Sequence, residues 1–194
     1  MDAADFVASR ADLPDGGRWT ELIAGEPVAF APPEPLHGTF VLNLSKALAE
    51  AAGKGAAAGR SGAGAVFETG LQTAVDPDTV RFPAVCLFDR GVFAQMDREI
   101  VDAVPSVVVE VPGTPDRRRE IGRRIEEYHA AGVDAVWIAD LSEETVNVAA
   151  PHAAPQTLGD SDRLTTNVLP DFAPTIADLF AVPEWWTGRR PTSD

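Results

Sequence analysis

Apolar residues in the first third of the chain recur with the period of a helix. Between residues 37 and 52, Phe40, Leu44 and Leu48 lie four positions apart and predict one amphipathic helix. Gly53 is expected to end that helix, because glycine readily adopts the left-handed conformation found after helix C-termini. A Gly- and Ala-rich connector is predicted to follow it.

The second half of the chain has the pattern of a strand, a helix and another strand. Residues 107–111 read Val-Val-Val-Glu-Val, which is typical of a strand buried on both faces. Residues 114–132 predict a helix that opens on Thr-Pro and closes on glycine. Residues 134–139 predict a second buried strand, with residues 144–149 as its hairpin partner. A strand, helix and strand with short links form a βαβ unit, so the two buried strands should be parallel.

Shorter runs in the first half predict strands joined by turns. Residues 21–30 read as two short strands around a glycine turn. Residues 66–74 and 80–88 are further strand candidates, joined by an Asp-Pro-Asp turn. Residues 91–104 lack a clear pattern and are expected to form a loop. The whole pattern predicts an α/β fold with a mixed central β-sheet flanked by helices.

The length of 194 residues favours one domain with short flanking segments. We expect the domain to span residues 19–182. Residues 1–18 are expected to form a flexible acidic segment, and residues 183–194 a C-terminal tail that contains two adjacent tryptophans. The pattern does not decide what those tryptophans contact.

Composition excludes several classes of protein. The formal net charge of −14 opposes tight binding to nucleic acid unless basic residues cluster. No apolar run approaches the roughly 20 residues of a membrane span, so no membrane partner is expected. The single cysteine, Cys86, excludes an internal disulfide and a cysteine-built zinc site, and it fits a reducing cytoplasm. The only lysines are Lys46 and Lys54, so every basic residue after position 54 is an arginine.

Glu110 stands out because valines surround it in the most apolar strand of the sequence. Burying a carboxylate is costly unless it is paired, hydrogen-bonded or bound to a metal. Either Glu110 lies at a solvated end of the strand, or it has a partner. Arg124 is a candidate partner, because it lies on the inward side of the following helix, which should pack back over its own strand.

Several short motifs recur in a recognisable order along residues 20–182. They are Glu21-Leu22-Ile23-Ala24-Gly25-Glu26, Pro35-Leu36-His37, Val108-Val109-Glu110-Val111, the stretch from Tyr128 to Asp140, and Val168-Leu169-Pro170-Asp171-Phe172. In this order and spacing they resemble the Uma-type putative restriction endonuclease family of the PD-(D/E)XK superfamily. The resemblance implies a restriction-endonuclease-like fold.

The resemblance also implies a divalent-metal nuclease site, with Mg²⁺ or Mn²⁺ as cofactor. Its metal-binding carboxylates would be Glu110 and an aspartate at position 84, with a lysine at position 124. This chain has Ala84 and Arg124 there. Glu21 and His37 match the family pattern and are the further candidate catalytic residues. Because two central groups are changed, we also consider that no metal is bound.

The arginine-rich helix offers the one plausible footprint for nucleic acid. Arg117, Arg118 and Arg123 could contact phosphates, although a run of charges is more often a solvated helix face. We therefore expect DNA to bind weakly if it binds. A homodimer is expected from the resemblance alone.

Three functions remain open at this point. The first is a nuclease-family protein with little or no catalytic activity, because Ala84 and Arg124 replace the expected aspartate and lysine. The second is an active Mg²⁺- or Mn²⁺-dependent DNA endonuclease that uses Glu110, Glu21 and His37. The third is a non-enzymatic interaction protein.

Overall fold

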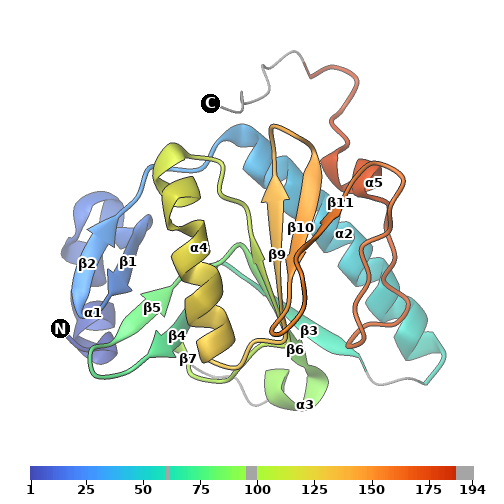
Figure 1. Cartoon of the computed structure of the whole chain (residues 1–194). Coiled ribbons are helices and arrows are strands. Elements are labelled where there is room, and N and C mark those ends of the chain that lie inside the picture. The colour runs from blue at the N-terminus through green and yellow to red at the C-terminus, as the bar shows by residue number, and fades with distance from the viewer. Residues whose placement is uncertain (60–61, 95–99, 187–194) are drawn as a thin grey trace.

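The computed structural model describes residues 1–59, 62–94 and 100–186. Within them the strands form two sheets (Figure 1). The first sheet has the order β2-β1-β5-β4-β7 and the second has the order β11-β10-β9-β8-β6-β3. The strands of the first are β1 (Thr20–Ile23), β2 (Glu26–Ala29), β4 (Gly70–Ala74), β5 (Thr79–Arg81) and β7 (Ile100–Val101). Those of the second are β3 (Ala63–Phe67), β6 (Val85–Asp89), β8 (Val107–Glu110), β9 (Ala135–Asp140), β10 (Thr145–Ala149) and β11 (Gln156–Leu158).

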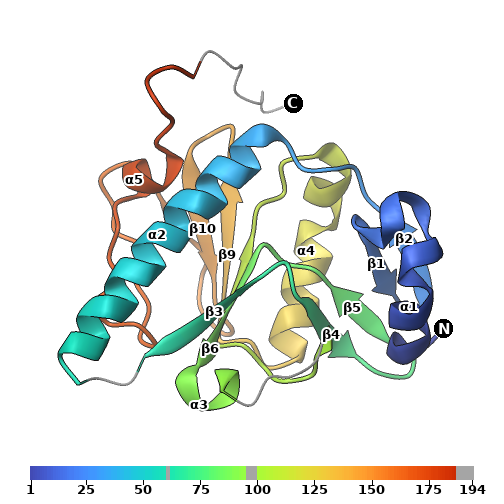
Figure 2. The same cartoon turned by 180° about the vertical axis from the view of Figure 1, so that it is seen from behind.

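Two long helices cover opposite faces of the second sheet. They are α2 (Pro35–Ala57) and α4 (Pro115–Ala130), and α4 lies in front of β8 and β9 in Figure 1, whereas α2 lies in front of the sheet in the reverse view of Figure 2. The alternating side chains of β8 separate the two interfaces. Val107 and Val109 pack with the α2 stripe, and Val108 packs with Tyr128 of α4. Shorter helices are α1 (Ala3–Ser9), α3 (Arg90–Phe93) and α5 (Ile176–Phe180).

The predicted strand–helix–strand unit is confirmed. Strands β8 and β9 are parallel, with Val108 opposite Val136, and α4 connects them. Strand β10 returns as the antiparallel hairpin partner of β9. The first hairpin, β1 with β2, also forms around the predicted glycine turn. None of the helices in the described ranges has the length and apolar character needed to cross a bilayer.

The two longer strand candidates of the first half are each divided between the sheets. The run 66–74 contributes to β3 and then β4, and it breaks at Glu68, whose backbone has a positive φ of 48°. The run 80–88 contributes to β5 and then β6, and it breaks next to Pro83, which has no N–H for a sheet ladder. The sequence pattern predicted each run as one strand. The break matters because a pocket forms there.

Helix α2 runs past the predicted stop at Gly53 and ends at Ala57. Glycine inside a helix costs about 1 kcal/mol relative to alanine. The inward stripe nevertheless continues through the buried residues Ala51 and Gly55, which pack beside the C-terminal part of the domain. Tertiary contact thus overrides the local stop signal. Arg60 and Ser61, in the expected connector, lie outside the described residues.

The N-terminal segment differs from the flexible lead-in expected for residues 1–18. Asp2 caps α1, and two 3-10 turns follow it before β1 begins. Phe6 is completely buried against Leu22 and Val80, so this segment packs onto the first sheet. Phe6, with Leu13 packed against the same apolar cluster, anchors the segment, which its acidic composition does not reveal.

The remaining expectations concern two regions with partial descriptions. The expected loop at 91–104 contains the end of α3 and the short strand β7, with residues 95–99 outside the described ranges. In the C-terminal tail, Trp185 is exposed, whereas Trp186 packs against the core. The rest of the tail, from residue 187, is also outside the described ranges.

Candidate functional site

Glu110 ends strand β8, and its carboxylate is buried under α4. Its Oε1 accepts hydrogen bonds from Nε of Arg124, at 2.8 Å, and from the Tyr128 hydroxyl, at 2.5 Å. A terminal nitrogen of Arg124 is also 2.7 Å from this oxygen. The pairing expected between Glu110 and Arg124 is therefore present. Arg124 and Tyr128 are one helical turn apart, which brings both donors to the same carboxylate.

Glu21 joins the same cluster from strand β1 of the other sheet. Its Oε2 lies 2.6 Å from Nη1 of Arg124 and 3.0 Å from Nη1 of Arg81. Its Oε1 accepts the backbone N–H of Phe82 at 3.3 Å. The Arg124 guanidinium thus lies between two buried carboxylates, one from each sheet.

Arg81 extends the cluster from strand β5 to Glu127 on α4. It is completely buried, and it pairs bidentately with Glu127 through Nε, at 2.7 Å, and Nη2, at 2.9 Å. Arg123 pairs with the same carboxylate from the outer face of the helix, at 2.9 Å. Buried charges need such complementary partners because neither water nor salt can screen them. We call the set Glu21, Arg81, Glu110, Arg124, Glu127 and Tyr128 the buried cluster.

The charges of the buried cluster shift one another's protonation. Burial by itself would raise the pKa of Glu21, but the attraction of Arg124 and Arg81 holds this pKa below its usual value. Burial raises the pKa of Tyr128 far above its usual range, and the neighbouring carboxylates act in the same direction. Arg124 stays protonated, because its attraction to Glu110 and Glu21 more than offsets its desolvation and raises its pKa. A carboxylate, a guanidinium and a neutral phenol are therefore the forms present near neutral pH.

Ala84 occupies the position beside Glu110 on the neighbouring strand. Val85 of β6 pairs with Val109 of β8, so the next step in this antiparallel register sets Ala84 opposite Glu110. Opposed side chains in such a ladder are about 5 Å apart, close enough for two carboxylates to share one cation. Alanine provides no oxygen ligand there. In the described ranges, no three His, Cys, Asp or Glu side chains are grouped as metal ligands.

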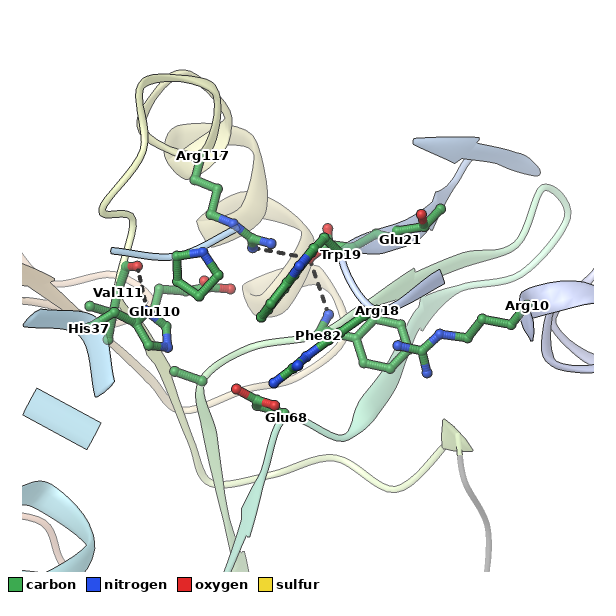
Figure 3. A pocket seen from close by; sticks show the side chains of 13 residues that line it. Arg10, Arg18, Trp19, Glu21, His37, Glu68, Phe82, Glu110, Val111 and Arg117 are labelled. Carbon is green, nitrogen blue, oxygen red and sulfur yellow. Dashed lines mark hydrogen bonds and ion pairs between the residues drawn. The ribbon is translucent and has the colours of Figure 1, made fainter. Parts of the chain in front are cut away.

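A pocket opens beside Glu110 at the break between the sheets. His37, Glu68, Ala84 and Arg117 are among the residues that line it (Figure 3). The His37 ring nitrogen Nδ1 lies 3.3 Å from the Val111 carbonyl oxygen. Burial lowers the pKa of His37 below its usual value, and the charge of Arg117 adds to this effect. The structure therefore brings Glu21, His37 and Glu110 to one pocket, as their sequence motifs suggested.

Comparison with known proteins identifies the family. The Uma2 family, described as putative restriction endonucleases, matches residues 7–179. The chain belongs to this family. The crystal structure of a putative nuclease of the DUF820 group from Anabaena variabilis superposes with a TM-score of 0.74 at 18% sequence identity. The match covers 93% of this chain and 97% of that one, and it confirms the restriction-endonuclease-like α/β fold. Among proteins of curated function, none matches the chain.

Members of the Uma2 family generally use divalent metals, but the residues of this chain do not fit such an ion. The Glu110 oxygen Oε1 is already paired with the guanidinium of Arg124. The opposing position is Ala84, whose side chain cannot ligate. A divalent cation there would meet a fixed positive charge and lack one carboxylate.

The arginines proposed for nucleic-acid contact have separate surroundings. Arg117 stacks on Phe30, with 5.0 Å between the guanidinium carbon and the ring centroid, and lines the pocket. Arg118 donates to the Gly113 carbonyl at 2.8 Å. Arg123, the most exposed of the three, pairs with a carboxylate of the buried cluster. Their role in binding DNA stays a prediction.

Sequence analysis missed three members of the buried cluster. Arg81 lies in a strand otherwise made of apolar and small residues, a signal of the same kind as Glu110 in its valine strand. Glu127 gives no such signal, because it follows Glu126 in a helix that is rich in charged residues. Tyr128 was named only as the start of a family motif, although a buried tyrosine hydroxyl usually needs a partner.

Proposed function

We propose that this Uma2-family chain no longer hydrolyses phosphodiester bonds with a metal ion and acts as a binding module on the nuclease fold. The observation that supports this most directly is the Arg124 guanidinium bridging Glu110 and Glu21. In a metal-dependent nuclease the carboxylates hold a cation that polarises phosphate and generates hydroxide. Here both carboxylates are already paired with a buried side chain that carries a fixed positive charge.

Arginine also cannot take over the chemistry of the expected lysine. Its guanidinium stays protonated at all physiological pH values, so it does not exchange a proton with an attacking water. Its planar donors suit bidentate pairing with carboxylates, which fixes the side chain in place. Arg124 has only 2% of its side chain exposed, and that burial further opposes its movement away from Glu110.

DNA is the partner that the nuclease family suggests, and we propose that this chain binds it weakly at most. The net charge of −14 repels a polyanion. Arg123 and Arg118 are committed to contacts within the protein. The homodimer expected from the family resemblance stays a prediction, and so does the cytoplasmic location.

Calorimetry and a cleavage assay test the proposal together. Titration with Mg²⁺ and Mn²⁺ to about 10 mM, above the weakest range of typical protein Ca²⁺ sites, should give no saturable heat. Supercoiled plasmid and single-stranded DNA should stay intact with Mn²⁺. Saturable Mn²⁺ binding, or cleavage that disappears in Glu110→Ala, would overturn the proposal.

An active nuclease is the second candidate, and one observation favours it. Phe67 pairs with Val85, and the Glu68 N–H donates to the Ala84 carbonyl at 3.3 Å. Glu68 therefore neighbours Ala84 on the side away from Glu110, and it lines the same pocket. A longer carboxylate from that position could replace the missing aspartate. Cleavage that is lost in both Glu68→Ala and Glu110→Ala would support this function.

A further inference from the structure

The pocket beside Glu110 is small and is walled partly by the N-terminal segment. Its volume is about 90 Å³, and a water molecule needs roughly 10–15 Å³ on this measure. It thus has room for several water molecules or for one compact polyatomic group. Arg18 and Trp19, which precede β1, form one side, and Pro33 and His37 form another (Figure 3).

Two guanidinium groups provide donors in the wall of this pocket. Arg117 pairs with Glu21 through Nη1 at 3.7 Å, whereas its buried Nε has no hydrogen-bond partner among the described residues. Buried polar atoms are normally paired, so such an atom in a pocket wall points to a missing acceptor. Arg18 stacks on Trp19, with 4.8 Å between the guanidinium carbon and the ring centroid, which leaves its N–H edges for another acceptor.

Acceptors line the same pocket, and they restrict what the ligand can be. Glu21, Glu68 and Glu110 contribute carboxylates, of which Glu21 and Glu110 are paired with Arg124. His37 is neutral near pH 7, because burial lowers its pKa. If its Nδ1–H donates to the Val111 carbonyl, its other ring nitrogen is an acceptor. A ligand there must accept hydrogen bonds from arginine and also donate at least one to a carboxylate or an imidazole.

We propose that this pocket binds a compact oxyanion that carries its own proton, namely hydrogen phosphate or the singly protonated terminal phosphate of a phosphomonoester, whose second pKa is about 6. Arg18 and Arg117 would hold its deprotonated oxygens, and Glu68 or His37 would accept from its P–OH group. Sulfate has the same shape and charge but no proton near neutral pH, so its oxygens would face the lone pairs of Glu68. The proposal rests on the proposed function, because it requires that no metal ion sits on Glu110.

Calorimetry with inorganic phosphate and sulfate tests the chemical class. We expect phosphate to bind with a Kd of about 1 mM or lower. Sulfate should bind at least about tenfold more weakly, because a sulfate oxygen that faces the Glu68 carboxylate cannot donate the charge-assisted hydrogen bond that a P–OH group donates. Glu68→Gln should remove this preference, because the amide can donate to sulfate. Equal affinities for the two anions in the unmodified protein would overturn the proposal.

Matched arginine variants test the location. Arg18→Gln and Arg117→Gln should each weaken phosphate binding by about tenfold or more, since each removes a charge-assisted contact. Arg119→Gln makes the same change in charge on an exposed part of α4 and should leave the Kd within about twofold, the scale of experimental scatter. An equal loss in all three variants would indicate general charge attraction and would overturn the proposal.

Two oligonucleotides distinguish free phosphate from a terminal phosphomonoester as the ligand. If a terminal phosphomonoester is the ligand, a 5′-phosphorylated single strand should compete with inorganic phosphate while its unphosphorylated counterpart should not. If neither strand competes, free phosphate is the ligand. Saturable phosphate binding combined with Mn²⁺-dependent cleavage would contradict the proposed function while supporting the pocket. Absence of both would contradict the pocket alone.

Discussion

Arg124 meets Glu110 through two nitrogens, Nε at 2.8 Å and a terminal nitrogen at 2.7 Å, and both reach the same oxygen, Oε1. Its remaining terminal nitrogen reaches Glu21 at 2.6 Å. Because Glu110 lies in the second sheet and Glu21 in the first, this one side chain of α4 connects both sheets. The buried cluster therefore joins the two sheets through α4.

Removal of Arg124 should destabilise the protein strongly. Arg124→Ala leaves Glu110 and Glu21 buried with fewer partners, and breaking a buried ion pair from one side typically costs about 3–5 kcal/mol. Urea unfolding monitored by circular dichroism measures the change in the free energy of unfolding. Arg119→Ala, on the exposed face of the same helix, should change it by no more than about 0.5 kcal/mol. Similar values for both variants would contradict a structural role for Arg124.

Tyr128 should resist ionisation until the protein unfolds. It is the single tyrosine of the chain, so tyrosinate absorbance reports on it alone. Burial raises its pKa well above the ordinary value of 10.0. Because the folded pKa is the higher one, the stabilisation is complete below pH 10 and is lost as pH rises toward the folded pKa. A spectrophotometric titration should show no tyrosinate at pH 10–11 in the folded protein, whereas the urea-unfolded protein should titrate near pH 10.

Glu21 should make the protein sensitive to acid. Its pKa is held below the ordinary value of 4.5 because Arg124 and Arg81 outweigh its burial. The stabilisation is therefore present above about pH 4.5 and is lost as pH falls toward the folded pKa. Glu21→Gln should lower the free energy of unfolding at pH 7. Below pH 4.5 it should also make this free energy fall less steeply with decreasing pH, by up to about 1.4 kcal/mol per pH unit. Glu26→Gln, at an exposed position, is the control and should leave the slope of the free energy of unfolding against pH unaltered.

Restoring the expected residues should restore cation binding. In the double variant Ala84→Asp with Arg124→Lys, a second carboxylate faces Glu110, and the guanidinium that blocks the cation is replaced by a slimmer ammonium group. We expect saturable Mn²⁺ binding with a Kd of about 1 mM or tighter, measured by calorimetry. Arg124→Lys alone should not bind, because it lacks the second carboxylate. A folded double variant without Mn²⁺ binding would show that the site lacks more than these two side chains.

The sequence pattern predicted those parts of the fold that depend on residues close to one another in the chain. The stripe of Phe40, Leu44 and Leu48 predicted α2, and these residues are buried as expected. The pairing of Glu110 with Arg124 was predictable because the helix packs back over its own strand. The breaks at Glu68 and Pro83 were not predictable, because apolar alternation does not reveal a strand that changes sheets.

The sequence by itself determined the βαβ unit, the family, and the two substitutions at Ala84 and Arg124, because each is written in adjacent or regularly spaced residues. Only the tertiary structure decided which charges meet. Arg81 reaches Glu127 and Arg124 reaches Glu21 across 46 and 103 positions of the chain. Such contacts depend on how two sheets and a helix pack together, and the buried low-dielectric interior then makes their pairing strong. The pocket wall formed by Arg18 and Trp19 arises in the same way, because Phe6 anchors the N-terminal segment to the first sheet.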